Sequence, residues 1–207
     1  MAEINIPIAD ETIRNLHCGD AVLLNGVMLT ARDAAHKWMT DTFIRKQRPQ
    51  AGDDAQVHAE LKRLLQGSLI YHCGPVVSGL ETREYAFVAA GPTTSIREEP
   101  YQADVLKHFN VKGVIGKGGM GTKTLQACTD TPAVYMHAIG GAASFLAQRV
   151  TRVLGVLKLE FGVPEAMWVI EVKQFPAVVT MDSHGESLHA RVEAQSRAVL
   201  DRLLTQA

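Results

Sequence analysis

One segment of the chain concentrates side chains that could bind a small anion. Residues 91–97 combine a Gly-Pro turn, the three successive hydroxyl residues Thr93, Thr94 and Ser95, and the guanidinium of Arg97. Hydroxyl groups and the backbone N–H groups of a turn can line a concave anion site. A guanidinium matches a carboxylate or phosphate with two parallel hydrogen bonds. The segment therefore predicts one wall of a small-anion site.

A second segment adds a positive charge on a flexible stem. Lys117 lies within residues 116–119, where glycines such as Gly119 let the backbone approach a ligand closely. The spacing of a nucleotide-binding P-loop is missing, and no serine or threonine follows Lys117. The two segments together favour a site for a small anion over a nucleotide site.

A third group of chemically capable side chains starts at Arg32. If the chain is helical here, Arg32 and His36 share one face, and Asp33 lies three residues before His36. The fork of Arg32 beside a helix start suits a substrate carboxylate, whereas Lys37 is expected only to pair with Asp33 on the surface. His36 either orients a neighbour or carries a proton. Five other histidines lack organised partners in the sequence and are expected to have no functional role: His58, His72, His137, His184 and His189.

The bulk composition narrows the class of protein. The 207 residues carry 21 basic and 22 acidic side chains, for a formal net charge of −1, so general attraction to nucleic acid or to a membrane is not expected. No transmembrane run or signal peptide is evident, which favours a cytoplasmic protein. The cysteines Cys18, Cys73 and Cys128 form no ligand pattern for zinc or an iron–sulfur cluster, so no metal ligand is expected on this chain.

Strands and helices must alternate to position these groups. The pattern predicts one layered α/β domain over residues 1–207. Residues 21–30 resemble a hairpin around Asn25-Gly26. Further strands are predicted at 68–77, 85–90, 111–115 and 133–136, and helices at 31–47, 54–66, 101–109 and 122–128.

The last third of the chain carries four more predicted elements. An alanine-rich helix is expected from Gly140 to about Val153. Two strands, 166–172 and 177–182, are separated by Phe175-Pro176. An amphipathic helix over 187–205 is expected to contribute core positions at Val192, Val199, Leu200, Leu203 and Leu204.

Several ordered motifs resemble the class I fumarate hydratase family, in the β region of these iron–sulfur hydro-lyases. L-tartrate dehydratase belongs to the same group. The resemblance runs over nearly the whole chain, and the matching segments are 29–37, 74–75, 91–97, 114–121, 139–143 and 162–168. Residues 139–143 and 175–177 look more like fumarases than tartrate dehydratases.

The resemblance implies a swivelling β/β/α domain with an active site at its junction with an α region. In the family, that α region carries a 4Fe–4S cluster on three cysteines. Because no α region is evident here, we expect the cluster to be held by a separate α subunit, in an α2β2 heterotetramer. The implied reaction is reversible addition of water to a double bond conjugated to a carboxylate, most simply between fumarate and L-malate.

The family motifs also imply roles for single residues. Arg32, Arg97 and Lys117 would bind substrate carboxylate and hydroxyl groups, and Thr93 would be the base, with cations stabilising its alkoxide. Thr94 and Gly119 are assigned to substrate binding, and Lys117 and His36 join Thr93 as candidate catalytic residues. Two alternatives stay open: a dehydratase for tartrate or another hydroxy diacid, and a dicarboxylate-binding module without catalysis.

Overall fold

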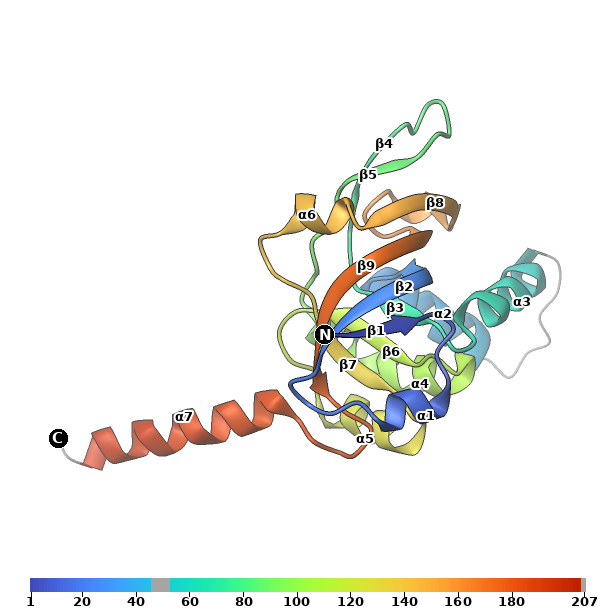
Figure 1. Cartoon of the computed structure of the whole chain (residues 1–207). Coiled ribbons are helices and arrows are strands. Elements are labelled where there is room, and N and C mark those ends of the chain that lie inside the picture. Colours follow the sequence, from blue (N-terminus) through green and yellow to red (C-terminus); the bar gives the residue numbers. More distant parts are fainter. Residues whose placement is uncertain (46–52, 206–207) are drawn as a thin grey trace.

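Seven strands form one sheet that closes on itself. The computed structural model describes residues 1–45 and 53–205, and Figure 1 shows the arrangement of the strands. The strand order is β1-β2-β3-β6-β7-β9-β8, and β9 also pairs with β2, so β2, β3, β6, β7 and β9 complete a ring. The strands are β1 (Ala2–Asn5), β2 (Ala21–Thr30), β3 (Leu69–Tyr71), β6 (Gly113–Gly116), β7 (Val134–His137), β8 (Val150–Leu157) and β9 (Met167–Met181).

Four strands of the ring share one direction, and this decides where a site can form. β2, β3, β6 and β7 pair in parallel, whereas β9 runs antiparallel to its neighbours. Their carboxyl ends, at Thr30, Tyr71, Gly116 and His137, therefore meet at one edge. In α/β sheets this edge is where loops gather to bind ligands.

Several helices cover one side of the sheet, and a small hairpin extends from the body at the top of Figure 1. The helical elements are α1 (Asp10–Arg14), α2 (Asp33–Met39), η1 (Thr40–Ile44), α3 (Asp53–Leu65), η2 (Ser95–Glu98), α4 (Glu99–Phe109), α5 (Thr122–Asp130), α6 (Ala143–Ala147), η3 (Leu159–Phe161) and α7 (Leu188–Thr205). The hairpin consists of β4 (Val76–Ser78) and β5 (Ala86–Ala89).

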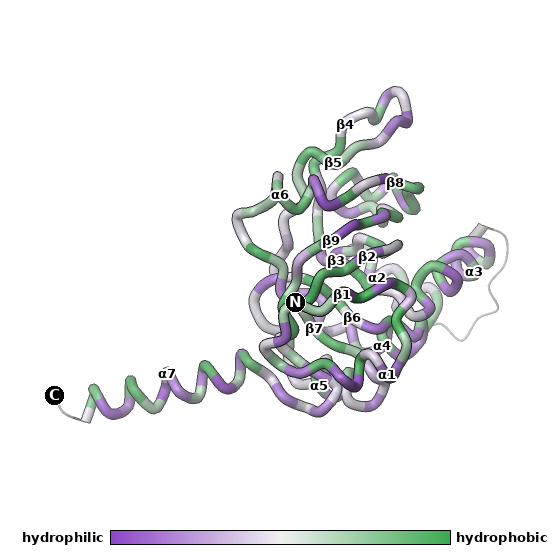
Figure 2. The backbone as a smooth tube through the Cα atoms, in the orientation of Figure 1, coloured by the Kyte–Doolittle hydropathy of each residue, from purple (hydrophilic) through white to green (hydrophobic). Residues whose placement is uncertain are grey.

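The core has two parts, one on each face of the closed sheet. Alternate residues of a strand point to opposite faces, so β3 sends Leu69 and Tyr71 to one cluster and Ile70 to the other. Tyr71 packs edge-on against Phe175 with 5.1 Å between ring centroids. On the helical side, Ile70 belongs to the cluster that includes Phe109 of α4. Burial of both faces explains why the parallel strands are almost continuously apolar (Figure 2).

The α/β class is confirmed, and most predicted elements are present. The hairpin at 21–30 is wrong, because β2 continues through Asn25-Gly26. Gly26 has φ of +117°, and a Cβ there would lie 2.7 Å from the carbonyl oxygen of Ile6, so the dipeptide forms an irregularity in pairing with β9 and lets β1 approach. Of the helix predicted at 31–47, residues 46 and 47 lie outside the described residues.

Two predictions in the last third of the chain are also wrong. The long helix from Gly140 shrinks to α6, and β8 follows it from Val150. The two late strands are a single strand, β9, that runs through Pro176. Pro176 is tolerated because it lies between Val172, which pairs with β8, and Val178, which pairs with β7. Its missing N–H therefore disrupts neither of those ladders.

The expected core positions of the last helix are exposed. α7 extends away from the body, as Figure 1 shows at its red end. Its large apolar side chains remain accessible, with exposed fractions of 55% for Val192, 44% for Val199, 53% for Leu200, 59% for Leu203 and 66% for Leu204. The apolar stripe is real, but this chain alone does not bury it.

Candidate active site

Two loops lie side by side at the carboxyl edge of the parallel strands. The backbone N–H of Thr93 donates to the carbonyl of His72, directly after β3, at 2.7 Å. The N–H of Lys117 donates to the carbonyl of Thr93 at 3.1 Å, and that of Ser95 to the carbonyl of Lys117 at 3.1 Å. The hydroxyl segment and the lysine loop are thereby joined as a short extension of the sheet.

Two guanidiniums converge on one carboxylate beside these loops. An oxygen of Asp33 lies 3.5 Å from Nη2 of Arg97 and 4.0 Å from Nε of Arg32. Asp33 does not pair with Lys37, contrary to the sequence expectation, because Lys37 forms an ion pair with Asp41 in η1, four residues further along the chain. Asp33 instead links the two arginines that the sequence singled out.

Arg32 is held on its other side by a segment distant in sequence. Its Nη2 lies 3.0 Å from a carboxylate oxygen of Glu165, and Nη1 lies 3.5 Å from the carbonyl of Pro164. A Cβ at Gly74 would lie 2.6 Å from Nη1, so the glycine makes room for the guanidinium. Only 19% of the Arg32 side chain is exposed, and this enclosure fixes its direction. Residue spacing alone did not indicate Glu165 as its partner.

A buried chain of polar groups lies beneath the two loops. Nε2 of His72 lies 2.9 Å from Oε1 of Gln102, which can only accept, so Nε2 carries the proton. Nδ1 of His72 is then an acceptor, and the hydroxyl of Ser95 donates to it at 2.8 Å. His72 thus has two partners, although no role was expected for it. It ties the hydroxyl loop to α4.

His36 extends this polar chain toward Arg32. Its Nδ1 donates to the Arg32 carbonyl at 2.9 Å, which leaves Nε2 as an acceptor close to Gln102. Burial lowers the pKa of His36 to about 4 and holds the pKa of His72 well below its usual value. Both rings are therefore neutral near pH 7. Full burial favours an orienting role for His36 over proton transfer to a ligand.

The lysine loop is fixed by a residue that the motifs did not single out. The carboxylate of Glu99 accepts hydrogen bonds from the N–H of Gly121 at 2.8 Å, the N–H of Lys123 at 3.0 Å and the hydroxyl of Thr124 at 2.6 Å. It thereby caps the start of α5, which directly follows the loop. The Gly-Lys-Gly-Gly segment is held between this cap and β6.

The remaining predicted residues lie around the same two loops. The hydroxyl oxygen of Thr93 is buried and has no hydrogen-bond partner among the described residues. Thr94 and Lys117 are exposed, and Thr94 pairs through its backbone with Lys117. Gly119 lies under His189, whose ring would contact a Cβ at 3.5 Å. Arg32, Thr93, Arg97 and Lys117 thus gather at one edge, while His36 lies below it.

One buried acid beside the site has an unusual environment. Glu98 is fully buried, and neither carboxyl oxygen has a hydrogen-bond partner within residues 1–45 and 53–205. Burial raises the pKa of Glu98 to about 7, with a smaller contribution in the same direction from Asp33. Near neutral pH, folding therefore favours the protonated acid.

Glu98→Gln is expected to stabilise the fold above pH 7 and to change stability little below pH 4.5. The folded pKa exceeds the unfolded value of 4.5, so the folded state binds the proton more tightly and wild-type stability falls as pH rises through this window. The difference between the folded and unfolded pKa values of Glu98 corresponds to about 3 kcal/mol in the free energy of unfolding. Urea unfolding of both proteins across this range measures it. The exposed Glu81→Gln is the control, and an equal effect of Glu98→Gln at both ends of the range would contradict the assignment.

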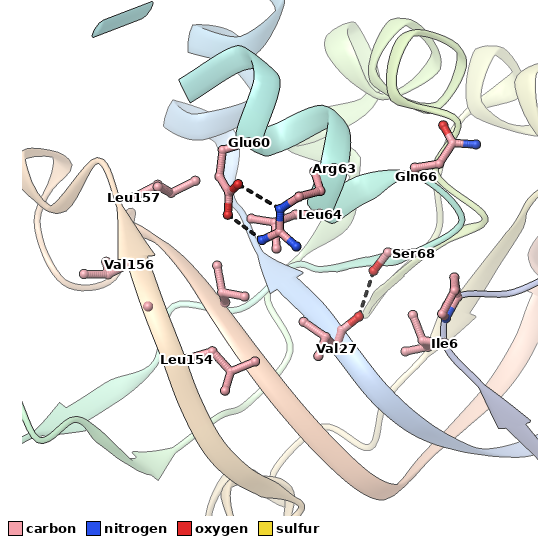
Figure 3. Close-up of a pocket in the computed structure, with 13 residues that line it drawn as sticks. Ile6, Val27, Glu60, Arg63, Leu64, Gln66, Ser68, Leu154, Val156 and Leu157 are labelled. Atoms are coloured by element: carbon pink, nitrogen blue, oxygen red, sulfur yellow. Dashed lines mark hydrogen bonds and ion pairs between the residues drawn. The ribbon is translucent and has the colours of Figure 1, made fainter. Parts of the chain in front are cut away.

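A separate hollow of about 430 Å³ lies at the opposite end of the parallel strands, between α3, β2 and β8 (Figure 3). Its lining is largely apolar, including Val27, Leu154 and Leu157. The guanidinium of Arg63 at its rim is paired with Glu60 at 2.7 Å. This hollow lacks the converging cations of the two-loop edge, so we do not place the site there.

Three further findings concern the described residues. Within them, no group of three or more histidine, cysteine, aspartate or glutamate side chains is placed to hold a metal ion. The three cysteines are free thiols. No helix in the described ranges is long and apolar enough to cross a membrane.

Comparisons with known proteins give a consistent result. The family model described as Fumarase C-terminus matches residues 1–192. A Geobacillus stearothermophilus protein, provisionally named as a class I fumarate hydratase, is 51% identical over 193 residues, which cover 93% of this chain and 34% of that relative. This chain thus spans about a third of that protein's length.

Two further relatives have lengths closer to that of this chain. The β subunit of L(+)-tartrate dehydratase from Escherichia coli K12 is 34% identical over 188 residues, covering 90% of this chain and 86% of the relative. A Methanocaldococcus jannaschii protein, provisionally named as the same subunit, is 35% identical over 199 residues, covering 95% of both chains.

Proposed function

The chain belongs to the Fumarase C-terminus family, and on that premise we propose that it is the β subunit of a hydro-lyase that interconverts fumarate and L-malate. The observation that carries the proposal is the convergence of Arg32 and Arg97 on Asp33, beside the joined loops of Thr93 and Lys117. Paired guanidiniums with a nearby ammonium suit a small dicarboxylate.

Each residue at this edge has a task in the proposed reaction. Arg32 and Arg97 bind substrate carboxylates and stabilise the negative charge that develops when a proton leaves the neighbouring carbon. Thr93, deprotonated to an alkoxide that the cations of Arg97 and Lys117 stabilise, accepts that proton and returns to a neutral hydroxyl. The hydroxyl of Thr93 is buried and has no hydrogen-bond partner in the part of the chain that the structure describes, which supports this task. The hydroxyl group on the adjacent carbon leaves toward the partner subunit, whose cluster would supply the Lewis acid. Thr94 and Gly119 shape the pocket through their backbones.

The proposed enzyme needs a second subunit. Two relatives of similar length are named as β subunits, which supports a separate α subunit. We place the cluster on a separate α subunit, in an α2β2 assembly, with the two-loop edge facing it. We also propose a cytoplasmic location, which the free thiols support.

L-tartrate dehydration is the second candidate. It is favoured by the two relatives of similar length, both named as β subunits of that enzyme, whereas the more identical relative is named as a fumarate hydratase. The arginines and Lys117 would serve either substrate. The difference lies in how the pocket accommodates a second hydroxyl group.

Anaerobic co-expression with the α subunit tests the proposal directly. Turnover is measured for L-malate, fumarate, L-tartrate and citramalate by the ultraviolet absorbance of the conjugated acid or by chromatography. Malate and fumarate turnover that requires both chains supports the fumarate hydratase. Turnover of tartrate alone supports the second candidate. Binding of a dicarboxylate by this chain with no turnover in any assembly would overturn the enzyme and leave a binding module.

Glu165→Gln is expected to raise KM about tenfold with a smaller change in kcat. The amide keeps the shape of the side chain but removes the negative charge that lies 3.0 Å from Nη2 of Arg32 and orients it. Loss of one charge-assisted contact is enough to account for a tenfold change in substrate affinity. Steady-state kinetics of the assembled enzyme measure the change. Glu160→Gln is the matched control, because Glu160 pairs with Lys158 at the same distance while 64% exposed. An unchanged KM in Glu165→Gln would contradict the orienting role.

A further inference from the structure

α7 contacts the body mainly through its first turn. His189 packs against His137 with 4.6 Å between ring centroids and covers Gly119. Beyond that turn the helix extends into solvent (Figure 1). The family model ends at residue 192, so most of α7 lies past the region that it matches. The projecting part therefore needs an explanation beyond the family's fold.

A row of side chains spaced by four residues runs along α7. Residues four apart form a ridge on a helix surface. The row consists of Leu188, Val192, Ser196, Leu200 and Leu204, and Figure 2 shows the alternation of apolar and polar residues along the helix. All but Ser196 are large and apolar. The small serine at the centre would allow a second helix to cross closely at that point.

The row is symmetric about Ser196. Val192 and Leu200 lie four residues on either side, and Leu188 and Leu204 lie eight residues on either side. Two copies of α7 related by a two-fold axis at Ser196 would therefore place Leu204 of one against Leu188 of the other, and Leu200 against Val192. Packing of four-residue ridges into each other is the commonest mode of helix contact. The pattern is self-complementary.

Two charged residues beside the row are also arranged in a self-complementary way. Glu193 precedes Ser196 by three residues and Arg197 follows it by one, on one flank of the helix. The two-fold arrangement brings Glu193 of each copy near Arg197 of the other, so opposite charges meet twice at the crossing. A partner of unrelated sequence would have no reason to match this spacing.

A hollow at the base of α7 provides room for the other helix. It has a volume of about 570 Å³ and lies between the helix and the ends of β7 and β9. His137, Thr180, Val192, Ser196 and Leu200 are among its lining residues. In the antiparallel arrangement, the exposed end of the second helix, with Leu204, approaches this hollow. Apolar side chains that are now in water would be buried on both copies.

We propose that α7 is a self-association helix, through which two copies of this chain pair antiparallel with Ser196 at the crossing point. The contact would join two β-type chains regardless of the reaction they serve. Its failure would leave the proposed hydro-lyase untouched, because the tests below measure association and not turnover.

Charge exchange tests the pairing of Glu193 with Arg197. Molar mass is measured by light scattering for the full chain over a range of concentrations. Wild type is expected to be dimeric. Glu193→Arg and Arg197→Glu should each raise the dissociation constant about tenfold or more, and the double exchange should restore it. Arg202→Glu, four residues from Ala198 on the outer face of the helix, should have no effect. A monomeric wild type, or a double variant no better than the single ones, would overturn the proposal.

Cross-linking tests the crossing point. Under mild oxidation, Ser196→Cys should give a covalent dimer of the full chain, alone and in complex with the α subunit. Ala198→Cys is the control, because Ala198 lies on the outer face of the helix and the variant keeps the same native cysteines. It should not form a covalent dimer. Equal cross-linking of both variants would overturn the crossing geometry. A dimer that disappears when the α subunit binds would assign the helix face to that subunit instead.

Discussion

Arg97→Ala is expected to lower turnover of the assembled enzyme by about two to three orders of magnitude, with the fold intact. Among the residues that the structure describes, the guanidinium of Arg97 has one ion-pair partner, Asp33 at 3.5 Å, and 46% of its side chain is exposed, so its removal leaves no cavity. What is lost is a charge next to the proposed base and substrate carboxylate. The loss should appear in kcat/KM, measured with unchanged circular dichroism and melting temperature.

Arg45→Ala is the matched control for this variant. Arg45 has a similar exposed fraction, 51%, and within residues 1–45 and 53–205 it has one ion-pair partner, Asp104 at 3.0 Å. It lies at the end of η1 and takes no part in the two-loop edge. Arg45→Ala should therefore retain nearly full turnover. Comparable activities of the two variants would remove Arg97 from the proposed site.

Gly116→Ala is expected to destabilise the chain by about 3–5 kcal/mol, the sum of overpacking and of a disrupted buried hydrogen bond. A Cβ at this position would lie 1.8 Å from the hydroxyl oxygen of Ser95 and 3.2 Å from Nδ1 of His72. The short serine side chain cannot withdraw without losing its bond to His72. For a chain of this size, the melting temperature should fall by about 10 °C.

Two controls separate this clash from the general effect of alanine in a strand. Gly155 lies in β8, and a Cβ there would meet no atom within 4 Å, so Gly155→Ala should change stability by about 0.5 kcal/mol or less. In a Ser95→Gly background, Gly116→Ala should cost less than in wild type, because the clashing hydroxyl is gone. A fully additive double variant would show that Ser95 is not the cause.

Local patterns in the sequence were sufficient for much of the fold. The strands at β3, β6 and β7 are short apolar runs bounded by turn residues, and both of their faces are buried, so their signal is strong. The Asn25-Gly26 dipeptide led to the wrong prediction of a hairpin, because a glycine at this position suits both a tight turn and the close approach of another strand. Only the contact with Ile6, which is remote from it in the chain, decides between them.

The candidate site was also predictable only in part from local patterns. Arg32, Thr93, Arg97 and Lys117 lie in segments whose residue types alone indicate anion binding, and the structure gathers those segments. Their supports were not predictable from spacing. Glu165 reaches Arg32 across 133 positions of the chain. Such partners are set by strand order, which local periodicity does not encode.

The exposed face of α7 was misjudged for a related reason. An amphipathic stripe indicates that a helix is covered, but it does not say by what. The chain itself does not cover it, since α7 extends from the body. Three of those predicted core positions, Val192, Leu200 and Leu204, belong to the row that is proposed to make a contact between chains.

Closure of the ring of strands by β9 has a consequence for how the protein folds during synthesis. Leu24 of β2 pairs with Phe175 of β9, so the ring cannot close until nearly the whole chain has been synthesised. At typical translation rates β2 waits about 10–30 s for its partner. During that time β2 and β7 present open hydrogen-bonding edges, which are prone to pair with other chains. The nascent protein should therefore depend on chaperones most strongly just before β9 leaves the ribosome.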